Sequence, residues 1–346
     1  MKNTLFVEPG KVKIENVDKP QIQADDDVIL RVVRTCVCGS DLWAYRGLSD
    51  KEKNSQNGGH EAIGVVESVG KDITTVKPGD FVIAPFTHGC GKCAACRAGY
   101  DGNCLNHKDN TTSGAQAEFL RYQHAEWSLV KVPGNPDDYS DAMLDSLLAL
   151  SDVMATGYHA AHAAEVSKGD TVVVVGDGAV GLCGVISAQM MGAKKIIIMS
   201  RHEDRQKLAF EFGATDAVAE RGDEAVEKVM QLTNNQGADA VLECVGTELS
   251  TETALKVARP GASVGRVGLP HVKNPDVVTP FIKNVALSGG IASVTTYDKN
   301  VLLKAVLDGE IHPGKVFTKS FDLDNIDDAY QAMTNREVIK AAITID

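Results

Sequence analysis

The chain has 346 residues, of which 43% are hydrophobic and 24% are charged, the profile of an ordinary globular protein. At this length two domains are expected rather than one. The formal net charge is −12 and no basic run occurs, which argues against nucleic acid as a partner, because such binding relies on Lys and Arg that neutralise phosphates. No apolar stretch is long enough to span a membrane, and the N-terminus lacks the apolar core of a secretion signal, so we expect a cytoplasmic protein without a membrane partner.

Short β-forming runs separated by turn signals dominate the chain up to residue 139. They include residues 27–37, 62–70 and 80–86. This pattern predicts a compact, partly barrel-like β unit. Residues 140–164 are instead apolar at helical spacing, which marks a change of architecture.

The first of these runs ends in TCVCGSD, where Cys36 and Cys38 form a metal pair, a redox pair, or one working cysteine beside one that packs. On an extended strand the two would lie about 6.6 Å apart, too far for a disulfide. His60 and Glu61 follow between glycines, and Asp152 stands where the β unit ends. A catalytic zinc needs three protein ligands and a free coordination position. Cysteine, histidine and a carboxylate from three segments can meet only if the fold brings them together, which we expect at a cleft between the domains.

Four of the eight cysteines, Cys90, Cys93, Cys96 and Cys104, have the spacing C-x₂-C-x₂-C-x₇-C. Four thiolates fill the tetrahedral shell of a structural zinc, and short glycine-containing spacers let one loop surround the ion. An iron–sulfur cluster remains an alternative, although the last spacing and the absence of proline after Cys104 make it less favoured. The acidic charge disfavours a nucleic-acid zinc knuckle. The remaining cysteines, Cys183 and Cys244, have the surroundings of small core residues.

From residue 170 onward, strands and helices alternate. The expected strands are 171–175, 194–199, 238–246 and 262–268, and the expected helices are 182–192 and 205–213. This alternation predicts a parallel sheet with right-handed crossovers. It weakens from about residue 291, where helix-like residues 300–309 and 326–335 flank strand-like residues 315–323.

The sequence GDGAVG directly follows the first strand of this half and opens a helix, the context of a dinucleotide-binding loop. Gly176 permits the tight turn, Gly178 lets the backbone approach a pyrophosphate, and Gly181 allows close packing of helix and strand. The predicted binding set also includes Ala179 and Val180, because the N–H groups at a helix N-terminus favour phosphate.

The end of the second strand bears on the choice of dinucleotide. An NAD site is expected to carry a carboxylate there, whereas this chain has Ser200 and Arg201, which suit the 2′-phosphate of NADP. Glu203 and Asp204 follow closely and should lie inside the next helix. Arg205 either adds a second positive contact or is a solvated helix residue. NADP is therefore the predicted cofactor, with NAD as the alternative.

These motifs together, in this order, resemble the zinc-dependent medium-chain alcohol dehydrogenase/reductase superfamily over nearly the whole chain. The match is strongest to the branch of bacterial secondary-alcohol and polyol dehydrogenases in which Asp or Glu replaces cysteine as the third ligand. The resemblance implies an α/β protein with a GroES-like β-rich catalytic domain at 1–152 and a doubly wound Rossmann domain at 153–290. It also implies a segment at 291–346 that returns to the catalytic domain.

By the same resemblance, Cys38, His60 and Asp152 would hold a catalytic zinc, and the four-cysteine lobe would hold a second, structural zinc. Glu61 is similar to the carboxylate that approaches the metal in some members. Ser40 would carry the alcohol proton away, or its hydroxyl would cap the following turn. Two departures stand out: Trp43 replaces the histidine of the proton relay, and Gly39 replaces a basic residue that some members use against the pyrophosphate.

The implied function is hydride transfer between a secondary alcohol and ketone, or an aldehyde, and NADP(H). The alternatives are an NAD-dependent polyol or threonine-type dehydrogenase and, more distantly, a non-catalytic zinc-stabilised binding protein. The resemblance suggests a homodimer or homotetramer. The other histidines have no recognisable ligand spacing and are expected to be surface or packing residues: His88, His107, His124, His159, His162, His202, His271 and His312.

Overall fold

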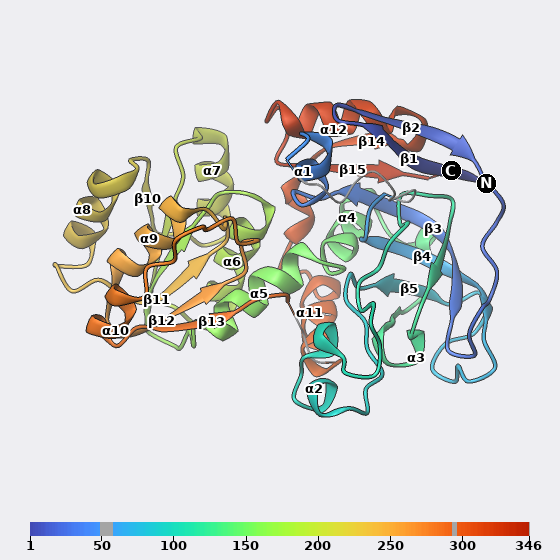
Figure 1. The fold of residues 1–346 in the computed structure, drawn as a ribbon, viewed down its shortest axis with the longest axis horizontal. Coiled ribbons are helices and arrows are strands. Elements are labelled where there is room, and N and C mark those ends of the chain that lie inside the picture. Colours follow the sequence, from blue (N-terminus) through green and yellow to red (C-terminus); the bar gives the residue numbers. More distant parts are fainter. Residues whose placement is uncertain (49–57, 293–295, 346) are drawn as a thin grey trace. The chain divides into compact units, whose positions relative to one another are not determined.

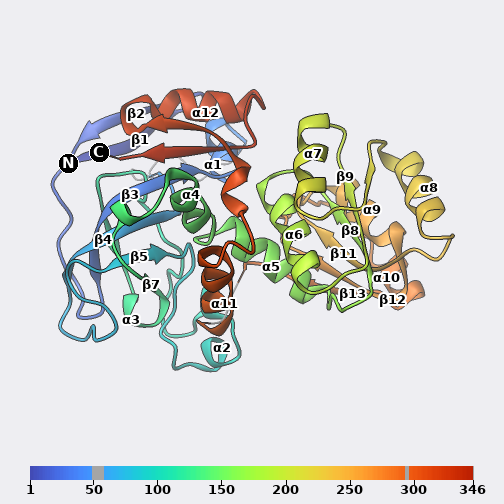
Figure 2. The same ribbon diagram turned by 180° about the vertical axis from the view of Figure 1, so that it is seen from behind.

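The computed structural model describes residues 1–48, 58–292 and 296–345 (Figures 1 and 2). The chain divides into two compact units, Met1–Asp152 together with Ser293–Asp346, and Val153–Ala292. None of the helices in the described ranges has both the length and the apolarity needed to cross a bilayer.

The first unit is built on a mostly antiparallel sheet with the strand order β14-β15-β3-β4-β5-β7, and β6 pairs with β3 off this path. Its strands are β3 (Val28–Val37), β4 (Ala62–Val69), β5 (Phe81–Ala84), β6 (Phe119–Tyr122), β7 (Val130–Val132), β14 (Phe317–Asp322) and β15 (Lys340–Thr344). The long strand β3 is buried along most of its length, which accounts for its nearly continuous run of Val, Ile and Leu. The β unit expected from residues 27–37, 62–70 and 80–86 is therefore present.

The C-terminal strand β15 joins this sheet antiparallel to β3, with Ala342 opposite Cys36. It pairs in parallel with β14 on its other side. Helix α12 (Ile326–Thr334) packs on β15 and on β2 (Lys11–Asn16) of the hairpin that β2 forms with β1 (Lys2–Glu8), as Figure 1 shows. The last part of the chain is thus an integral layer of the first unit. The remaining helices of this unit are α1 (Asp41–Tyr45), α2 (Ala94–Arg97), α3 (Ala125–Ser128), α4 (Asp141–Ala149) and α11 (Thr296–Leu307).

The apolar stretch at 140–164 forms two helices rather than one. Helix α4 begins with Ser140, whose hydroxyl accepts a hydrogen bond from the amide of Met143, and α5 begins at Val153 and ends at Ala163. At the break, the carbonyl of Ser151 accepts a hydrogen bond from the amide of Phe86, just beyond β5. This contact places Asp152 beside the end of the sheet.

The second unit is a six-stranded, all-parallel sheet with the order β10-β9-β8-β11-β12-β13. Its strands are β8 (Thr171–Val175), β9 (Lys195–Met199), β10 (Asp216–Val218), β11 (Ala238–Glu243), β12 (Ala258–Arg266) and β13 (Ala286–Gly289). Its helices are α5, α6 (Ala179–Met190), α7 (Glu203–Glu211), α8 (Gly222–Leu232), α9 (Glu248–Val257) and α10 (Val278–Lys283). Chain order reverses direction at β8, the switch point of a doubly wound fold, so right-handed crossovers place helices on both faces. The predicted fold class, a Rossmann sheet plus a β-rich unit, is confirmed.

Candidate functional site

Four potential metal ligands converge in the first unit: Cys38, His60, Glu61 and Asp152, whose ligand atoms all lie within 4.8 Å of one another. Cys38 directly follows β3, and His60 and Glu61 directly precede its antiparallel neighbour β4. Because Thr35 pairs with Ala62, the end of one strand and the start of the next meet at one edge of the sheet. The break after α4 brings the carboxylate of Asp152 to the same edge.

The group has the electrostatic character of a cation site. Nε2 of His60 lies 3.4 Å from Oδ2 of Asp152, and Sγ of Cys38 lies 3.7 Å from that same oxygen. Burial alone would lower the pKa of His60, but the neighbouring Asp41, Cys38 and Asp152 raise it well above its usual value. These side chains therefore favour a positive charge at their centre, and a thiolate, an imidazole and a carboxylate are a donor set that zinc accepts.

Asp41 orients this edge, although its role was not foreseen from the sequence. Its Oδ2 accepts a hydrogen bond from the amide of Cys38 at 2.9 Å, and its Oδ1 lies 3.5 Å from Nδ1 of His60. A carboxylate next to the second ring nitrogen fixes the orientation of a metal-binding histidine. The position of Asp41 in the CGSD motif, three residues after Cys38, was the available signal.

Behind the cluster lies a buried ion pair between Glu61 and Lys340, both almost fully inaccessible. Nζ of Lys340 donates to Oε1 of Glu61 at 2.7 Å and to the carbonyl of Val37 at 3.2 Å. Burial alone would lower the pKa of Lys340, but Cys36 and Glu61 raise it well above its usual value, so the ammonium stays charged. The other carboxylate oxygen of Glu61, Oε2, is buried and has no hydrogen-bond partner among the described residues. It is thus available to a cation.

Cys36 and Cys38 differ as their surroundings require. Cys36 is 1% exposed, and burial raises the pKa of its thiol well above the usual value, which suits an inert packing residue.

Ser40, next to the cluster, is exposed at the start of α1, and its side chain makes no capping hydrogen bond there. The alternative in which this hydroxyl caps the turn is therefore not what the structure contains. Trp43 lies on the same helix and is partly buried.

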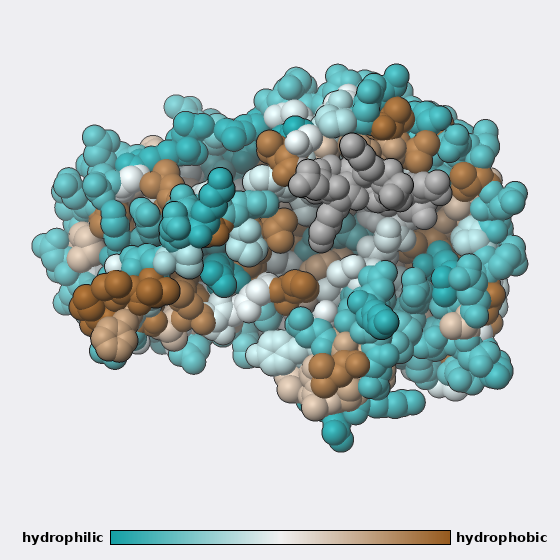
Figure 3. Space-filling model, viewed as in Figure 1, coloured by the Kyte–Doolittle hydropathy of each residue, from teal (hydrophilic) through white to brown (hydrophobic). Residues whose placement is uncertain are grey.

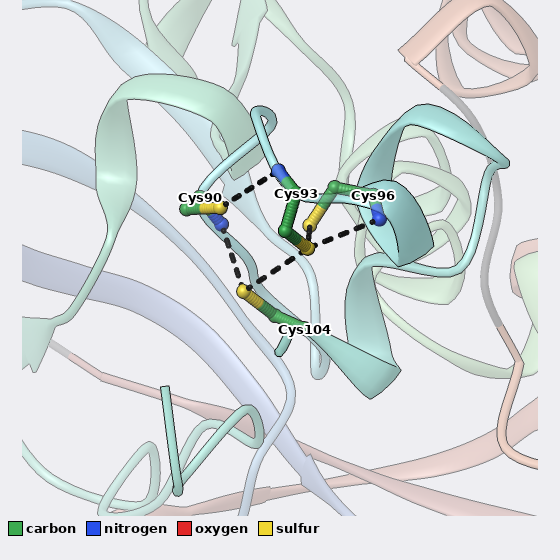
Figure 4. Close-up of side chains that lie close together, drawn as sticks. All are labelled: Cys90, Cys93, Cys96 and Cys104. Atoms are coloured by element: carbon green, nitrogen blue, oxygen red, sulfur yellow. Dashed lines mark hydrogen bonds between the residues drawn. The ribbon is translucent and has the colours of Figure 1, made fainter. Parts of the chain in front are cut away.

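The four-cysteine lobe forms a second cluster, with Cys90, Cys93, Cys96 and Cys104 facing one another (Figure 4). All four sulfurs are free of disulfides. The Cys93 and Cys96 sulfurs lie 3.4 Å apart, and the Cys93 and Cys104 sulfurs lie 3.9 Å apart. The donor set of four converging thiols fits a closed zinc site.

Backbone amides prepare these sulfurs to carry negative charge. The amides of Cys96 and Leu105 donate to Sγ of Cys93, and they lower the pKa of that thiol to about 6. Burial instead raises the pKa of Cys96 to about 12, so this sulfur needs a cation to become a thiolate. Gly91 is required in this loop, because its φ is +68° and a Cβ there would lie 2.4 Å from the ring of Trp127.

The dinucleotide-binding loop lies in the second unit, between β8 and α6. Gly176 adopts φ +115°, a conformation that only glycine accepts readily, and a Cβ on Gly181 would lie 2.0 Å from the carbonyl oxygen of Gly176. No atom of the described residues lies within 4 Å of the position that a Cβ on Gly178 would occupy, which leaves the backbone there open to a ligand. Helix α6 starts at Ala179, which presents the free amides of its first turn, including that of Val180.

The residues expected to contact a 2′-phosphate divide into two kinds. Ser200 is buried and donates to Oδ2 of Asp177 at 2.7 Å, and Nη1 of Arg205 lies 3.2 Å from Oδ1 of the same residue. Arg205 is therefore anchored to the loop rather than solvated. Arg201 alone is exposed. Glu203 and Asp204 lie in the first turn of α7, as expected.

Comparison with known proteins identifies the family. Residues 24–134 match the model of the alcohol dehydrogenase GroES-like domain, and residues 179–304 match that of the zinc-binding dehydrogenases. A zinc-type alcohol dehydrogenase B of Aspergillus flavus is 33% identical, over 88% of this chain and 68% of its own. A probable zinc-binding alcohol dehydrogenase of Mycobacterium tuberculosis is 31% identical, over 93% of this chain and 82% of its own.

Among solved structures, an alcohol dehydrogenase from Thermus sp. ATN1 is similar over the full length of both chains, with a TM-score of 0.89 and 30% identity. The chain therefore belongs to the zinc-dependent medium-chain dehydrogenase/reductase superfamily, as the resemblance in its motifs indicated. It is an oxidoreductase of the alcohol dehydrogenase type, a class that uses zinc and a nicotinamide cofactor.

The buried pair of Lys340 and Glu61 yields a first prediction. Lys340→Met leaves the buried Glu61 carboxylate without its cationic partner. We therefore expect the free energy of unfolding to fall by about 3–5 kcal/mol. The double variant Lys340→Met/Glu61→Gln should recover much of this loss, because no uncompensated charge remains. Thermal unfolding monitored by circular dichroism measures both.

Lys319→Met is the matched control, because Lys319 is exposed on β14 and its replacement should change stability by no more than about 0.5 kcal/mol. Equal melting temperatures for Lys340→Met and Lys319→Met would show that the buried pair contributes nothing.

Proposed function

We propose that the protein is a zinc-dependent alcohol dehydrogenase that interconverts a secondary alcohol and its ketone, or an aldehyde and its alcohol, with NADP(H). The observation that carries the proposal is the convergence of Cys38, His60 and Asp152, from three separated segments, at one edge of a sheet. The choice of NADP follows from Ser200 and Arg201 after the second strand of the nucleotide-binding unit.

In this proposal Cys38, His60 and Asp152 hold the catalytic zinc, and the four cysteines of the lobe hold a structural zinc. Zinc and NADP(H) supply Lewis-acid polarisation of the substrate oxygen and a hydride acceptor or donor, respectively. Asp41 holds the His60 ring in the orientation that presents Nε2 to the ion. Glu61 adds a carboxylate whose negative charge Lys340 balances from the other side.

Ser40 is the proposed proton acceptor for the substrate hydroxyl. Its hydroxyl is exposed and is not used as a helix cap, so it can accept the proton of the substrate hydroxyl while it releases its own proton to solvent. The absence of a histidine at Trp43 is consistent with a short route of this kind. Three groups then act together at this edge: a metal site, a proton acceptor and the Glu61 carboxylate.

A second candidate, an NAD-dependent polyol or threonine-type dehydrogenase, is favoured by one observation. Asp177 places a carboxylate in the dinucleotide-binding loop, and a carboxylate accepts ribose hydroxyls but repels a 2′-phosphate. Its charge is opposed by Arg205, 3.2 Å away, and for this reason we place NADP first. A non-catalytic binding protein is disfavoured, because it would not need an open set of three mixed ligands beside an exposed hydroxyl.

The metal assignment predicts that Asp152→Asn lowers kcat by about 100-fold or more. The variant replaces a charged zinc ligand by a neutral amide, which weakens binding of the ion that would polarise the substrate oxygen. The zinc content should fall by one equivalent, and the melting temperature should stay close to that of the unsubstituted protein because the four-cysteine lobe is untouched. Steady-state kinetics and elemental mass spectrometry give the two readouts.

Asp137→Asn serves as the control, since Asp137 is exposed in the turn before α4. Unchanged turnover in Asp152→Asn would remove this residue from the active site. Loss of turnover in Asp137→Asn as well would point to a general effect of lost charge.

The cofactor assignment predicts that Arg201→Ala lowers kcat/KM for NADP by about 10- to 100-fold, the value of a charge-assisted hydrogen bond, and leaves kcat/KM for NAD unchanged. Lys207→Ala removes an exposed cation from the neighbouring helix and should affect neither cofactor. If the unsubstituted protein prefers NAD strongly, the second candidate replaces the first.

We also propose that the protein is a homodimer through the edge strand β13. All four residues of β13 are exposed, and among the described residues only β12 pairs with it, so its other edge has no partner strand there. Phe281, Ile282 and Val277 are each at least 70% exposed, on and before α10, and Figure 3 shows a hydrophobic patch where Figure 1 places α10. A self-complementary pairing of two β13 edges would satisfy the strand and cover the apolar patch.

Introducing charge at this edge should separate the subunits. The double variant Phe281→Lys/Leu287→Lys is expected to elute as a monomer in size-exclusion chromatography with light scattering, because four lysines would oppose one another in the dimer. Phe210→Lys changes an exposed aromatic residue on α7, outside the patch, and should leave the mass unchanged. A dimer that persists in the double variant places the interface elsewhere.

A further inference from the structure

A third group of potential ligands lies in the first unit and shares no residue with the two proposed zinc sites. Asp26, His107 and His124 place their ligand atoms within 4.8 Å of one another. Asp26 precedes β3, His107 lies in the loop that leaves the four-cysteine lobe, and His124 stands between β6 and α3. No residue of this group belongs to the other two clusters, and the sequence spacing gave no indication of it.

The contacts within the group are close. Nδ1 of His124 lies 2.7 Å from Oδ2 of Asp26, and the rings of His107 and His124 are stacked with centroids 3.3 Å apart and planes inclined by 18°. Nε2 of His107 is buried and has no hydrogen-bond partner among the described residues. A buried ring nitrogen without a partner is costly, so its presence beside a carboxylate and a second imidazole calls for a ligand.

The backbone holds these groups in place. His124 adopts the left-handed conformation, with φ 52° and ψ 43°, which sets the direction of its side chain. The amide of the next residue, Ala125, donates to the carbonyl of Asp26 at 2.9 Å. The buried ring of His88 also packs against His124, with ring centroids 5.4 Å apart. The cluster is therefore an ordered part of the fold rather than a chance approach of surface side chains.

Charge balance favours a metal ion over a proton at this position. Two imidazolium rings stacked this closely would repel each other strongly, so at least one ring must be neutral. A neutral imidazole keeps a free lone pair, as a metal ligand must.

We propose that Asp26, His107 and His124 bind a third divalent cation, Zn²⁺ or an ion of the same borderline class. Two imidazole nitrogens and one carboxylate oxygen match the ligand preference of such ions, and three protein ligands leave a coordination position open. The ion ties the loop that leaves the four-cysteine lobe to the start of β3 and the end of β6. Such an ion would add a connection between the four-cysteine lobe and the sheet beyond the one that the polypeptide chain makes.

The test is a titration of Zn²⁺ into purified protein in which the two proposed zinc sites are already loaded. Isothermal titration calorimetry measures the binding. We expect one further equivalent of Zn²⁺ to bind with a dissociation constant of about 10 µM or tighter, and this equivalent to be absent in Asp26→Asn and in His124→Asn. Asparagine is chosen at residue 124 because it tolerates the left-handed backbone. The circular dichroism spectrum checks that each variant is folded.

Two controls match the variants in residue type. Asp25→Asn removes an exposed neighbouring carboxylate, and His162→Ala removes an exposed histidine on α5; both should bind the extra equivalent as the unsubstituted protein does. Absence of the extra equivalent in the unsubstituted protein, or its persistence in both cluster variants, would overturn the proposal. The measured quantity is a difference of one ion, so it stays interpretable even if the catalytic zinc assignment fails.

Discussion

The edge of the first unit where the proposed zinc ligands meet depends on one constraint: a carboxylate that is almost fully buried must have a cation beside it. Glu61 is 1% exposed and meets the ammonium of Lys340, 279 residues further along the chain. Burial raises the pKa of Glu61 and the ammonium of Lys340 opposes this effect, so without this partner the carboxylate would be driven towards its neutral form beside the proposed metal ligands. The antiparallel pairing of β15 with β3 brings Lys340 to Glu61. The charge of the site therefore depends on the order of strands in the sheet.

The four-cysteine lobe and the cluster around Cys38 have different surroundings, which suit different chemical roles. In the lobe, the sulfurs of Cys90, Cys93 and Cys104 accept backbone N–H groups, and all four sulfurs converge, so an ion bound there would have four protein ligands and no position for a substrate. At the edge of the sheet, one sulfur shares its space with an imidazole and two carboxylates next to an exposed hydroxyl. Uniform, closed ligation suits a group that holds a fold together, whereas mixed ligation beside a proton acceptor suits one that takes part in a reaction.

Most strands and helices could be predicted from the sequence because they depend on local patterns: the Val-rich run of β8, the glycines of the loop after it and the apolar spacing of α12. The cysteines of the lobe, Cys38 and His60 stand out in short motifs, whereas Asp152 was proposed as a ligand only through the family resemblance. Lys340, Asp177 and the group around His124 were not recognisable, because each acts through a partner brought close only by the fold. The sequence around Lys340 is an ordinary β-forming run, and nothing in it indicates a buried ammonium. Side chains that meet across a sheet have no fixed spacing along the chain, so local sequence patterns cannot predict these contacts.

Asp177 has a consequence for the rate and selectivity of nucleotide capture. Its side chain joins the loop after β8 to Ser200 and Arg205, which follow β9, so two separate turns are already cross-linked. A preorganised loop loses little conformational entropy when a dinucleotide arrives, and more of the contact energy appears as affinity. In the proposed NADP site this bridge keeps the Arg205 guanidinium paired, and the exposed Arg201 remains the cation that would meet a 2′-phosphate. Weakening the pair between Asp177 and Arg205 would release a second cation, which makes this ion pair a target for re-engineering cofactor preference.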